Sequence, residues 1–162
     1  MSMIGRLRII SNDEKIKADS NHSLYEDIVF DSLSLCTDNW WDQLWFIYYI
    51  WIQDNNIIDM SNPSYQRFNG ESFEVGSDVG YGKLQYLNPQ QTKKIYEFLA
   101  SIDNEQLVKY ALTKKCNEML YPHYWPEDLQ SDYSWIINYM ESLKEYYKKA
   151  VESEFGMLQA IT

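Results

Sequence analysis

The sequence has few cysteines, no long hydrophobic run and few basic residues. Its two cysteines, Cys36 and Cys116, form neither a CxxC pair nor a metal-ligand spacing, so we expect reduced thiols rather than a disulfide or zinc scaffold. The longest charge-free aromatic run, residues 43–53, is too short to span a bilayer. No apolar stretch of signal-peptide length follows Arg6 and Arg8. These absences predict a cytoplasmic protein.

Basic residues are outnumbered: 14 Lys and Arg stand against 24 Asp and Glu, giving a net charge of −10. Binding to nucleic acid or to an anionic membrane requires clustered cations, so both partners are disfavoured. Acids concentrate in residues 31–82, which hold eight acids and one base, and in residues 116–162, which hold eight acids and three lysines. Such segments fit a solvated acidic surface, or a surface that attracts a basic protein partner.

The 162 residues, 45% hydrophobic and 23% charged, suit a single globular domain spanning residues 1–162. Residues 1–10 alternate apolar and basic side chains and predict a first strand, and residues 157–161 predict a last one. Helical spacing of apolar residues predicts the helices between them. We therefore expect an α/β fold of the mixed α+β type, in which a small sheet that includes both chain termini is packed by helices.

Helix boundaries are marked by local capping signals. Ser11 with Glu14, and Asn88 with Gln91, have the spacing of a capping box, and Pro89 suits the first helical position. Further helices are predicted from the following features: apolar spacing over residues 24–35, a cap at Asp103 or Asn104, a long helix opened by Ser131 or Asp132, and Gly156 as the stop of that long helix.

Residues 40–52 form the most unusual segment, because a helix over these residues would carry Trp, Tyr and large aliphatic side chains on nearly all sides. Asp38 can cap it, and its length favours a helix over a strand. A helix that is apolar all round normally lies in the centre of a fold, so we expect a core helix. Because Trp and Tyr dominate interface hot spots, the other interpretation makes part of this stripe a binding surface.

Glycine punctuates the middle of the chain. Asn69-Gly70 fits either a hairpin turn between residues 65–68 and 72–75 or the end of a short helix begun at Pro63. Residues 76–84 resemble a phosphate loop, but the spacing is one residue too long and Leu84 replaces the Mg²⁺-binding hydroxyl residue. We therefore predict a turn with positive φ angles that places Tyr81 against the fold.

No complete catalytic or metal-binding set is recognisable. The chain has only two histidines, His22 and His123, and the prolines beside His123 disfavour a regular helical ligand array. Neither cysteine has a local nucleophile signature. We therefore predict no catalytic residue, no metal and no cofactor.

Several short segments resemble, in the same order, the YfbM-like family, a bacterial domain of unknown function. The matching segments are MSMIG at 1–5, WDQLWF at 41–46, GYG at 80–82, YLNP at 86–89, KCNEM at 115–119 and Tyr121-Pro122. Trp45 stands where the family has a histidine, which removes an acid–base candidate. The resemblance implies a single mixed α/β domain with helices on a sheet, and no established activity, cofactor or catalytic residue.

Residues 121–128 combine two prolines, two tyrosines, a histidine, a tryptophan and two acids. The prolines disfavour a helix, so we expect an ordered loop. Tyr124 and Trp125, with Glu127 and Asp128 beside them, have the composition of a hot spot for a basic partner, whereas Tyr121 is expected to cover the core. The rival interpretation places Trp125 in the core as well.

The sequence predicts a non-catalytic cytosolic domain that binds a protein with a basic surface, for example an immunity-type protein that neutralises a toxin. The alternative is an enzyme or a small-ligand-binding protein with a pocket near Asp42, Tyr81 and Tyr121. For Asp42, a first-turn acid favoured by the helix dipole is the simpler explanation. The candidate binding residues are Trp41, Asp42, Trp45, Tyr81, Tyr121, Tyr124, Trp125, Glu127 and Asp128.

Overall fold

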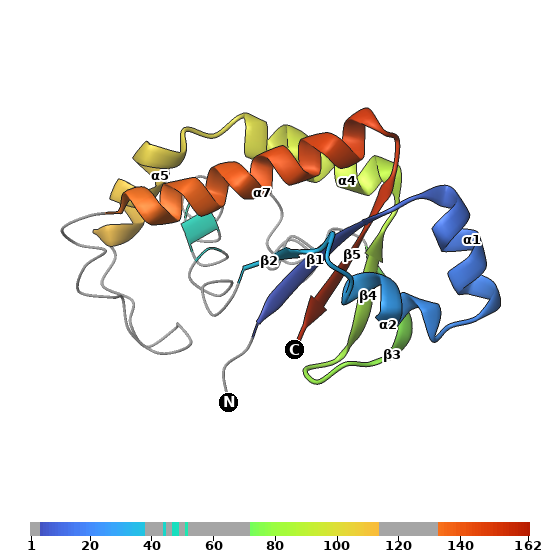
Figure 1. Ribbon diagram of the computed structural model, residues 1–162. Helices are drawn as coiled ribbons and strands as arrows, with labels where there is room; N and C mark the ends of the chain where they lie inside the picture. Colours follow the sequence, from blue (N-terminus) through green and yellow to red (C-terminus); the bar gives the residue numbers. More distant parts are fainter. Residues whose placement is uncertain (1–3, 38–43, 45–46, 49–50, 52–71, 114–132) are drawn as a thin grey trace.

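The computed structural model of the chain describes residues 4–37, 44, 47–48, 51, 72–113 and 133–162 (Figure 1). Within these ranges the strands form one five-stranded antiparallel sheet in the order β2-β1-β5-β4-β3. The strands are β1 (Gly5–Ile10), β2 (Leu35–Cys36), β3 (Phe73–Asp78), β4 (Lys83–Leu87) and β5 (Gly156–Ile161). The helices are α1 (Asn12–Ser20), α2 (Leu24–Val29), α4 (Pro89–Ala100), α5 (Asn104–Leu112) and α7 (Ser134–Glu152).

The first and last strands of the chain pair with each other. β1 and β5 are in register from Gly5 opposite Ile161 to Ile10 opposite Gly156. Beyond them, the backbone N–H of Ile4 donates to the Thr162 carbonyl at 2.8 Å, and the Thr162 N–H donates to the Ile4 carbonyl at 3.0 Å, next to the C-terminus marked in Figure 1. The predicted fold class, mixed α+β with both termini in a small sheet packed by helices, is confirmed.

The two predicted capping boxes are present. The Ser11 hydroxyl accepts from the Glu14 N–H at 3.3 Å, and the Glu14 carboxylate accepts from the Ser11 N–H at 2.8 Å. Asn88 and Gln91 make the same reciprocal pair at 2.9 and 2.8 Å. Asp103 is the N-cap of α5. Each box satisfies N–H groups that the first turn of a helix otherwise leaves unpaired, so these starts depend only on local sequence.

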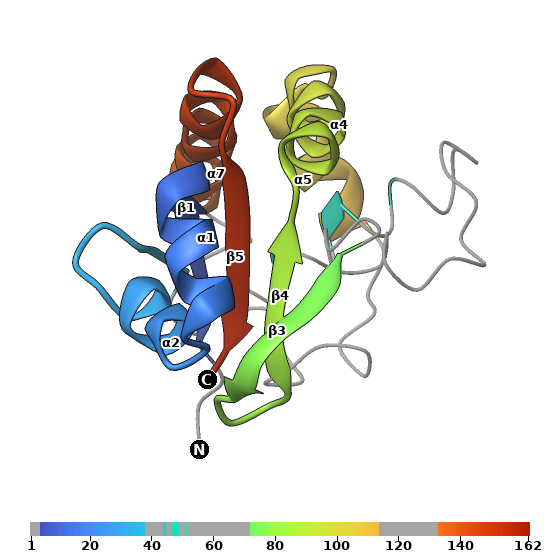
Figure 2. The same cartoon turned by 90° about the vertical axis from the view of Figure 1, so that its right-hand side faces the viewer.

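The larger hydrophobic core lies between one face of the sheet and helices α4, α5 and α7. α4 and α7 run side by side over the sheet in both views (Figure 1; Figure 2). Leu87 and Met157 enter this core from the strands, and Leu99 and Met140 enter it from α4 and α7. Helical spacing of apolar residues in α4 and α7 therefore produced the expected buried faces.

A smaller core lies on the opposite face, where α1 and α2 pack beside β1 and β5 (Figure 2). Its buried residues are Ile10, Ala18, Tyr25, Val29, Leu84, Leu158 and Ala160. Successive strand residues point to opposite faces, so Met157 belongs to the larger core and Leu158 to the smaller one. β5 is consequently buried on both sides, which explains its apolar composition.

The aromatic segment is described at residues 44, 47, 48 and 51, all of them helical. Leu44, Ile47 and Tyr48 are buried in the larger core, and the partly buried Trp51 packs edge-on against Tyr110. The prediction of a core helix is confirmed at these positions. The rest of the segment lies outside the described residues.

The segment predicted as a helix over residues 24–35 is shorter than expected. α2 ends at Val29, and Leu35 and Cys36 form β2, paired with Leu7 and Arg6 of β1. Between them the chain turns, and the Asp31 carboxylate accepts from the Leu33 N–H at 2.9 Å. Long-range strand pairing therefore overrides an apolar spacing that also suits a helix.

The end of α7 also differs from the prediction. The helix stops at Glu152, Glu154 adopts a positive φ of 55°, and Gly156 opens β5 instead of ending the helix. A Cβ atom on Gly156 would lie 2.6 Å from the Leu87 carbonyl oxygen. The glycine is therefore required for the close approach of β4. Ser131 and Asp132, the predicted start of this helix, lie outside the described residues.

Candidate functional site

The best defined of the candidate residues is Tyr81, at the tip of the β3–β4 hairpin. Residues 65–71, the other place where a hairpin or helix end was considered, lie outside the described residues. The turn around Tyr81 contains Gly80 and Gly82 with φ of 137° and 116°, so the prediction of a turn with positive φ angles is confirmed. A Cβ atom added at Gly82 would have no other atom within 4 Å, so a glycine is needed there for its positive φ angle and not for lack of space.

Several hydrogen bonds fix this turn. One carboxylate oxygen of Asp78 accepts from the N–H groups of Gly80 at 2.9 Å and Gly82 at 3.3 Å. The Val79 N–H donates to the Gly82 carbonyl at 3.1 Å, and the Tyr81 N–H donates to the Ile161 carbonyl at 3.3 Å. The Tyr81 backbone is therefore tied both to its own turn and to the end of β5.

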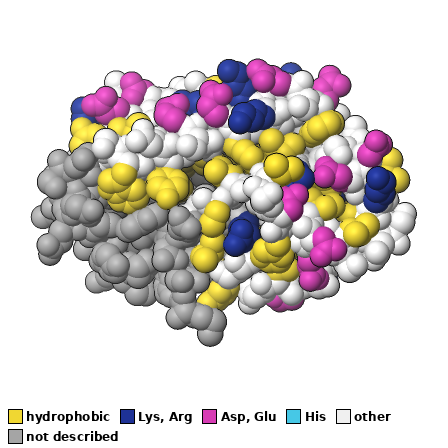
Figure 3. All heavy atoms as spheres, viewed as in Figure 1, with side chains coloured by type: hydrophobic (Ala, Val, Ile, Leu, Met, Phe, Trp, Pro, Cys, Tyr) yellow, Lys and Arg dark blue, Asp and Glu magenta, His cyan; other side chains and the backbone are white. Residues whose placement is uncertain are grey.

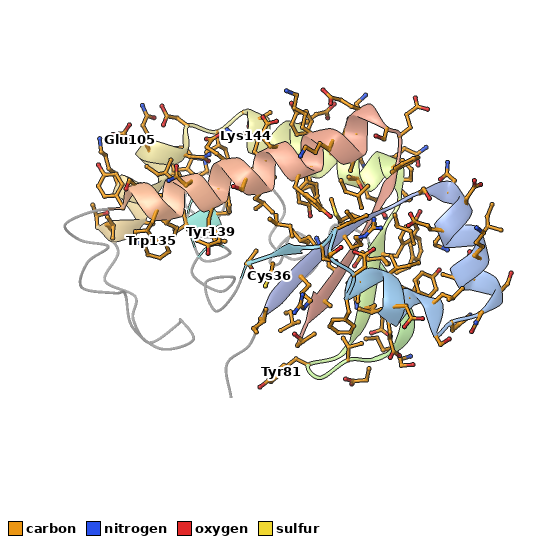
Figure 4. The ribbon with its side chains drawn as sticks, viewed as in Figure 1. Cys36, Tyr81, Glu105, Trp135, Tyr139 and Lys144 are labelled. Carbon is orange, nitrogen blue, oxygen red and sulfur yellow. The ribbon has the colours of Figure 1, made fainter. Side chains whose placement is uncertain are left out.

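The Tyr81 side chain was expected to lie against the fold, and that expectation is wrong. The residue is 46% exposed, and its side chain points away from the sheet (Figure 4). The glycines set the backbone direction of the turn, whereas the side chain of the residue between them faces outward. The result is an aromatic side chain held on the surface by an ordered backbone.

A second exposed apolar group lies in the turn between α2 and β2. Phe30 is 44% exposed and Leu33 is 66% exposed. The Arg6 guanidinium lies over the Phe30 ring, 5.4 Å from its centroid. The Leu33 carbonyl accepts from the Tyr146 hydroxyl at 2.8 Å, which ties this turn to α7. Leu33 fits an apolar helical spacing over residues 24–35, so the sequence did not mark this turn as exposed.

Sequence reasoning missed a buried ionic cluster centred on Arg8. Its Nε atom donates to the two carboxylate oxygens of Asp31 at 2.8 and 2.9 Å, and an Nη atom lies 3.2 Å from a Glu14 oxygen. Arg8 is only 6% exposed. The Arg8 hydrogen bond lowers the pKa of Asp31 below its ordinary value. Arg6 and Arg8 are two positions apart on β1, which indicates a shared face but not which acids would meet them.

A second polar cluster joins α1, α2 and β4. The Lys15 ammonium is 2.6 Å from an Asp19 oxygen and lies over the rings of Tyr25 and Tyr86. The buried Tyr25 donates its hydroxyl proton to Asp19. Burial lowers the pKa of Lys15, but the hydrogen bonds with Asp19 and Tyr25 outweigh burial and raise it overall. A lysine held charged in this way is suited to an ion pair and not to acting as a base.

The remaining candidate binding residues lie outside the described residues. They are Trp41, Asp42, Trp45, Tyr121, Tyr124, Trp125, Glu127 and Asp128. The pocket near Asp42, Tyr81 and Tyr121 and the loop at 121–128 therefore stay predictions. Across the described ranges, no group of three His, Cys, Asp or Glu residues is placed to hold a metal ion. No helix in the described part of the chain is long and apolar enough to cross a membrane.

Acidic and basic side chains mix over the upper helices in Figure 3, where lysines alternate with acids above α7. Most of these charges pair within one helix, as in Lys93–Glu97, Lys109–Glu105, Lys144–Glu141 and Lys148–Glu145. The described residues carry 15 acids and 11 bases, and the other segments carry 9 acids and 3 bases. The acidic excess is therefore greater in the segments that contain most of the candidate binding residues.

Comparison with known proteins supports the fold and the family. The crystal structure of a protein of unknown function, YfbM from Escherichia coli, matches with a TM-score of 0.68 and 22% sequence identity, over 98% of this chain and 99% of that chain. At this identity the match shows the fold alone. No curated protein matches the sequence. Residues 1–160 match the domain of unknown function DUF1877, and the chain therefore belongs to this YfbM-like family.

Proposed function

We propose that this chain is a non-catalytic cytosolic domain that binds another protein through an acidic and aromatic surface. The observation that carries the proposal is Tyr81, an exposed aromatic side chain on a turn that Asp78 and the end of β5 hold in place. An ordered backbone reduces the entropy lost on binding, and tyrosine contributes a large contact area with few rotatable bonds. An exposed tyrosine of this kind suits an interface anchor.

The charge of the chain indicates the kind of partner. A net charge of −10 favours a basic surface, because opposite charges speed association and disfavour acidic competitors. A concrete version of the proposal is an immunity-type protein that covers the basic active site of a toxin. The outward direction of Tyr81 also favours an interface over the alternative of a ligand pocket that Tyr81 would line.

The first experiment tests the immunity version. The gene should lie directly downstream of a toxin gene, and co-expression with that toxin should restore growth. The two purified proteins should form a complex whose association rate falls as salt is added, because salt screens charge attraction. Absence of both protection and a complex would reject this version of the proposal.

A second experiment tests the residue, using the partner found in the first. Tyr81→Ala should weaken binding by about 30-fold or more, the scale of an interface hot spot. Its free energy of unfolding should change by less than about 0.5 kcal/mol, since the side chain is exposed. Phe73→Ala is the matched control, because Phe73 is 58% exposed at the other end of the same hairpin. Equal binding by both variants and the wild type would show that Tyr81 is not a contact.

A further inference from the structure

Arg6 and Arg8 lie two residues apart on β1 and therefore on the same face of the sheet, but their surroundings differ. The Arg8 guanidinium is bound by Asp31, Glu14 and the Ile9 carbonyl. The Nε atom of Arg6 is buried and has no hydrogen-bond partner. Among the residues that the structure describes, no carboxylate forms an ion pair with Arg6, although the chain as a whole is strongly acidic.

The neighbours of Arg6 contact its guanidinium without accepting its hydrogen bonds. Phe30 stacks on its planar face, with the central carbon 5.4 Å from the ring centroid. Cys36 is directly opposite on β2 and Ala160 is directly opposite on β5, and neither is an acid. Arg6 as a whole is partly exposed, and the aromatic ring covers only one face of its guanidinium, so the terminal Nη–H groups stay open to solvent although the Nε atom is enclosed. No described residue accepts a hydrogen bond from these Nη–H groups, so an acceptor from outside the chain can bind them.

We propose that Arg6 and Phe30 form a binding site for a carboxylate group. The plane and the donor spacing of a guanidinium match a carboxylate in a two-point hydrogen bond, and at Arg6 the two Nη groups supply it because the Nε atom is enclosed. The neighbouring Arg8 makes a two-point bond to Asp31 through its Nε atom and an Nη atom. A doubly charged phosphate suits the site less well, because Arg8 is already neutralised by two acids and the whole chain carries −10. The site is independent of the proposed function, since it takes an anion rather than a basic surface.

The experiment observes the two arginines separately. In ¹⁵N-labelled protein, the Nε–H signals of Arg6 and Arg8 are assigned with Arg6→Lys and followed while sodium acetate replaces sodium chloride at constant ionic strength. The Arg6 signal should shift and saturate, whereas the Arg8 signal, held by Asp31, should not move. Arg6→Gln should bind acetate at least about tenfold more weakly, the loss expected for a charge-assisted hydrogen bond. Phe30→Ala should weaken binding while leaving the Arg6 signal present.

Two further arms distinguish the source and the class of the anion. Tighter binding by an aspartate-containing tripeptide than by acetate would identify an acidic side chain of a partner protein, and the reverse would identify a small free acid. Tighter binding of inorganic phosphate than of acetate would overturn the carboxylate assignment. Thermal unfolding gives a second readout: acetate should raise the melting temperature of the wild type relative to chloride, and not that of Arg6→Gln. No difference in either measurement would overturn the site.

Discussion

The contrast between Arg8 and Arg6 gives the sharpest test of what stabilises the smaller core. Methionine has a similar length to arginine without the charge, so Arg8→Met and Arg6→Met make the same chemical change on one face of one strand. Arg8→Met removes three contacts with Asp31 between 2.8 and 2.9 Å and one contact with Glu14 at 3.2 Å. Arg6→Met removes only the cation–π contact of the guanidinium with the Phe30 ring.

The size of the effect follows from burial. Breaking a buried ion pair by removing one partner costs about 3–5 kcal/mol, because the other charge stays desolvated. The side chains of Asp31 and Glu14 are about one third exposed, at 32% and 36%, so water can partly replace the lost guanidinium. We therefore expect Arg8→Met to cost about 2–3 kcal/mol. Arg6→Met should cost less than about 1 kcal/mol, the scale of an exposed cation–π contact.

Urea unfolding of the wild type and both variants measures these costs, and unchanged m-values would confirm a common unfolding reaction. The pH dependence adds a second check. Burial raises the pKa of Glu14, but hydrogen bonds from Ser11 and the charge of Arg8 lower it overall, and Arg8 lowers the pKa of Asp31. Carboxylates with a lowered folded-state pKa stabilise the fold above their unfolded pKa and lose this effect as the pH falls.

The difference in the free energy of unfolding between the wild type and Arg8→Met should therefore be fully present at pH 7 and should become smaller below about pH 4. The corresponding difference between the wild type and Arg6→Met should stay constant over the same pH range, because no described carboxylate pairs with Arg6. Equal costs for the two variants at pH 7 would refute the assignment of Arg8 as the centre of this cluster. If the stability difference between the wild type and Arg8→Met grows as the pH falls, the pairing of Arg8 with Asp31 and Glu14 does not stabilise the fold.

Three further changes test local features of the fold by urea unfolding. Gly156→Ala should cost about 3 kcal/mol or more, because the added methyl group meets the Leu87 carbonyl oxygen on a paired strand. Asn88→Ala should cost about 1 kcal/mol, because the N-cap acceptor of α4 is lost, and Asn88→Asp should retain most of the stability. Tyr147→Phe should cost about 1 kcal/mol, because the buried Gln159 amide donates to the Tyr147 hydroxyl at 2.7 Å. An unchanged free energy of unfolding would show that this hydrogen bond does not stabilise the fold.

Features that depend on neighbouring residues were predictable from the sequence. The capping boxes at Ser11 and Asn88, the strand at each end of the chain and the buried faces of α4 and α7 all follow from spacings of four residues or fewer. The pairing of β1 with β5 joins opposite ends of the chain, so local spacing indicates the two strands but not that they are neighbours in the sheet. The family resemblance is confirmed over residues 1–160.

Features that depend on distant contacts were missed or misread. The Arg8–Asp31 pair joins residues 23 positions apart, and nothing in the local sequence marks either as the partner of the other. Gly156 resembles a helix stop, but the reason for the glycine is a carbonyl group on β4. Leu35 fits an apolar helical pattern, but its pairing with Leu7 makes it a strand residue. Of the candidate binding residues, the structure describes Tyr81. The sequence predicted the turn that contains it but not the outward direction of its side chain.

Tyr81 and Arg6 lie at the same end of the sheet, which permits a test of whether one partner contacts both. Arg6 is opposite Ala160, near the end of β5, and the Tyr81 N–H binds the carbonyl of the next residue, Ile161. A partner that covers this end would contact Tyr81 and place a carboxylate near Arg6. Tyr81→Ala and Arg6→Gln should then each weaken the same complex, and together they should weaken it by an amount that differs from the sum of the single effects. If Arg6→Gln leaves that complex unchanged while still losing acetate, the carboxylate site serves a different ligand and the protein partner does not reach it.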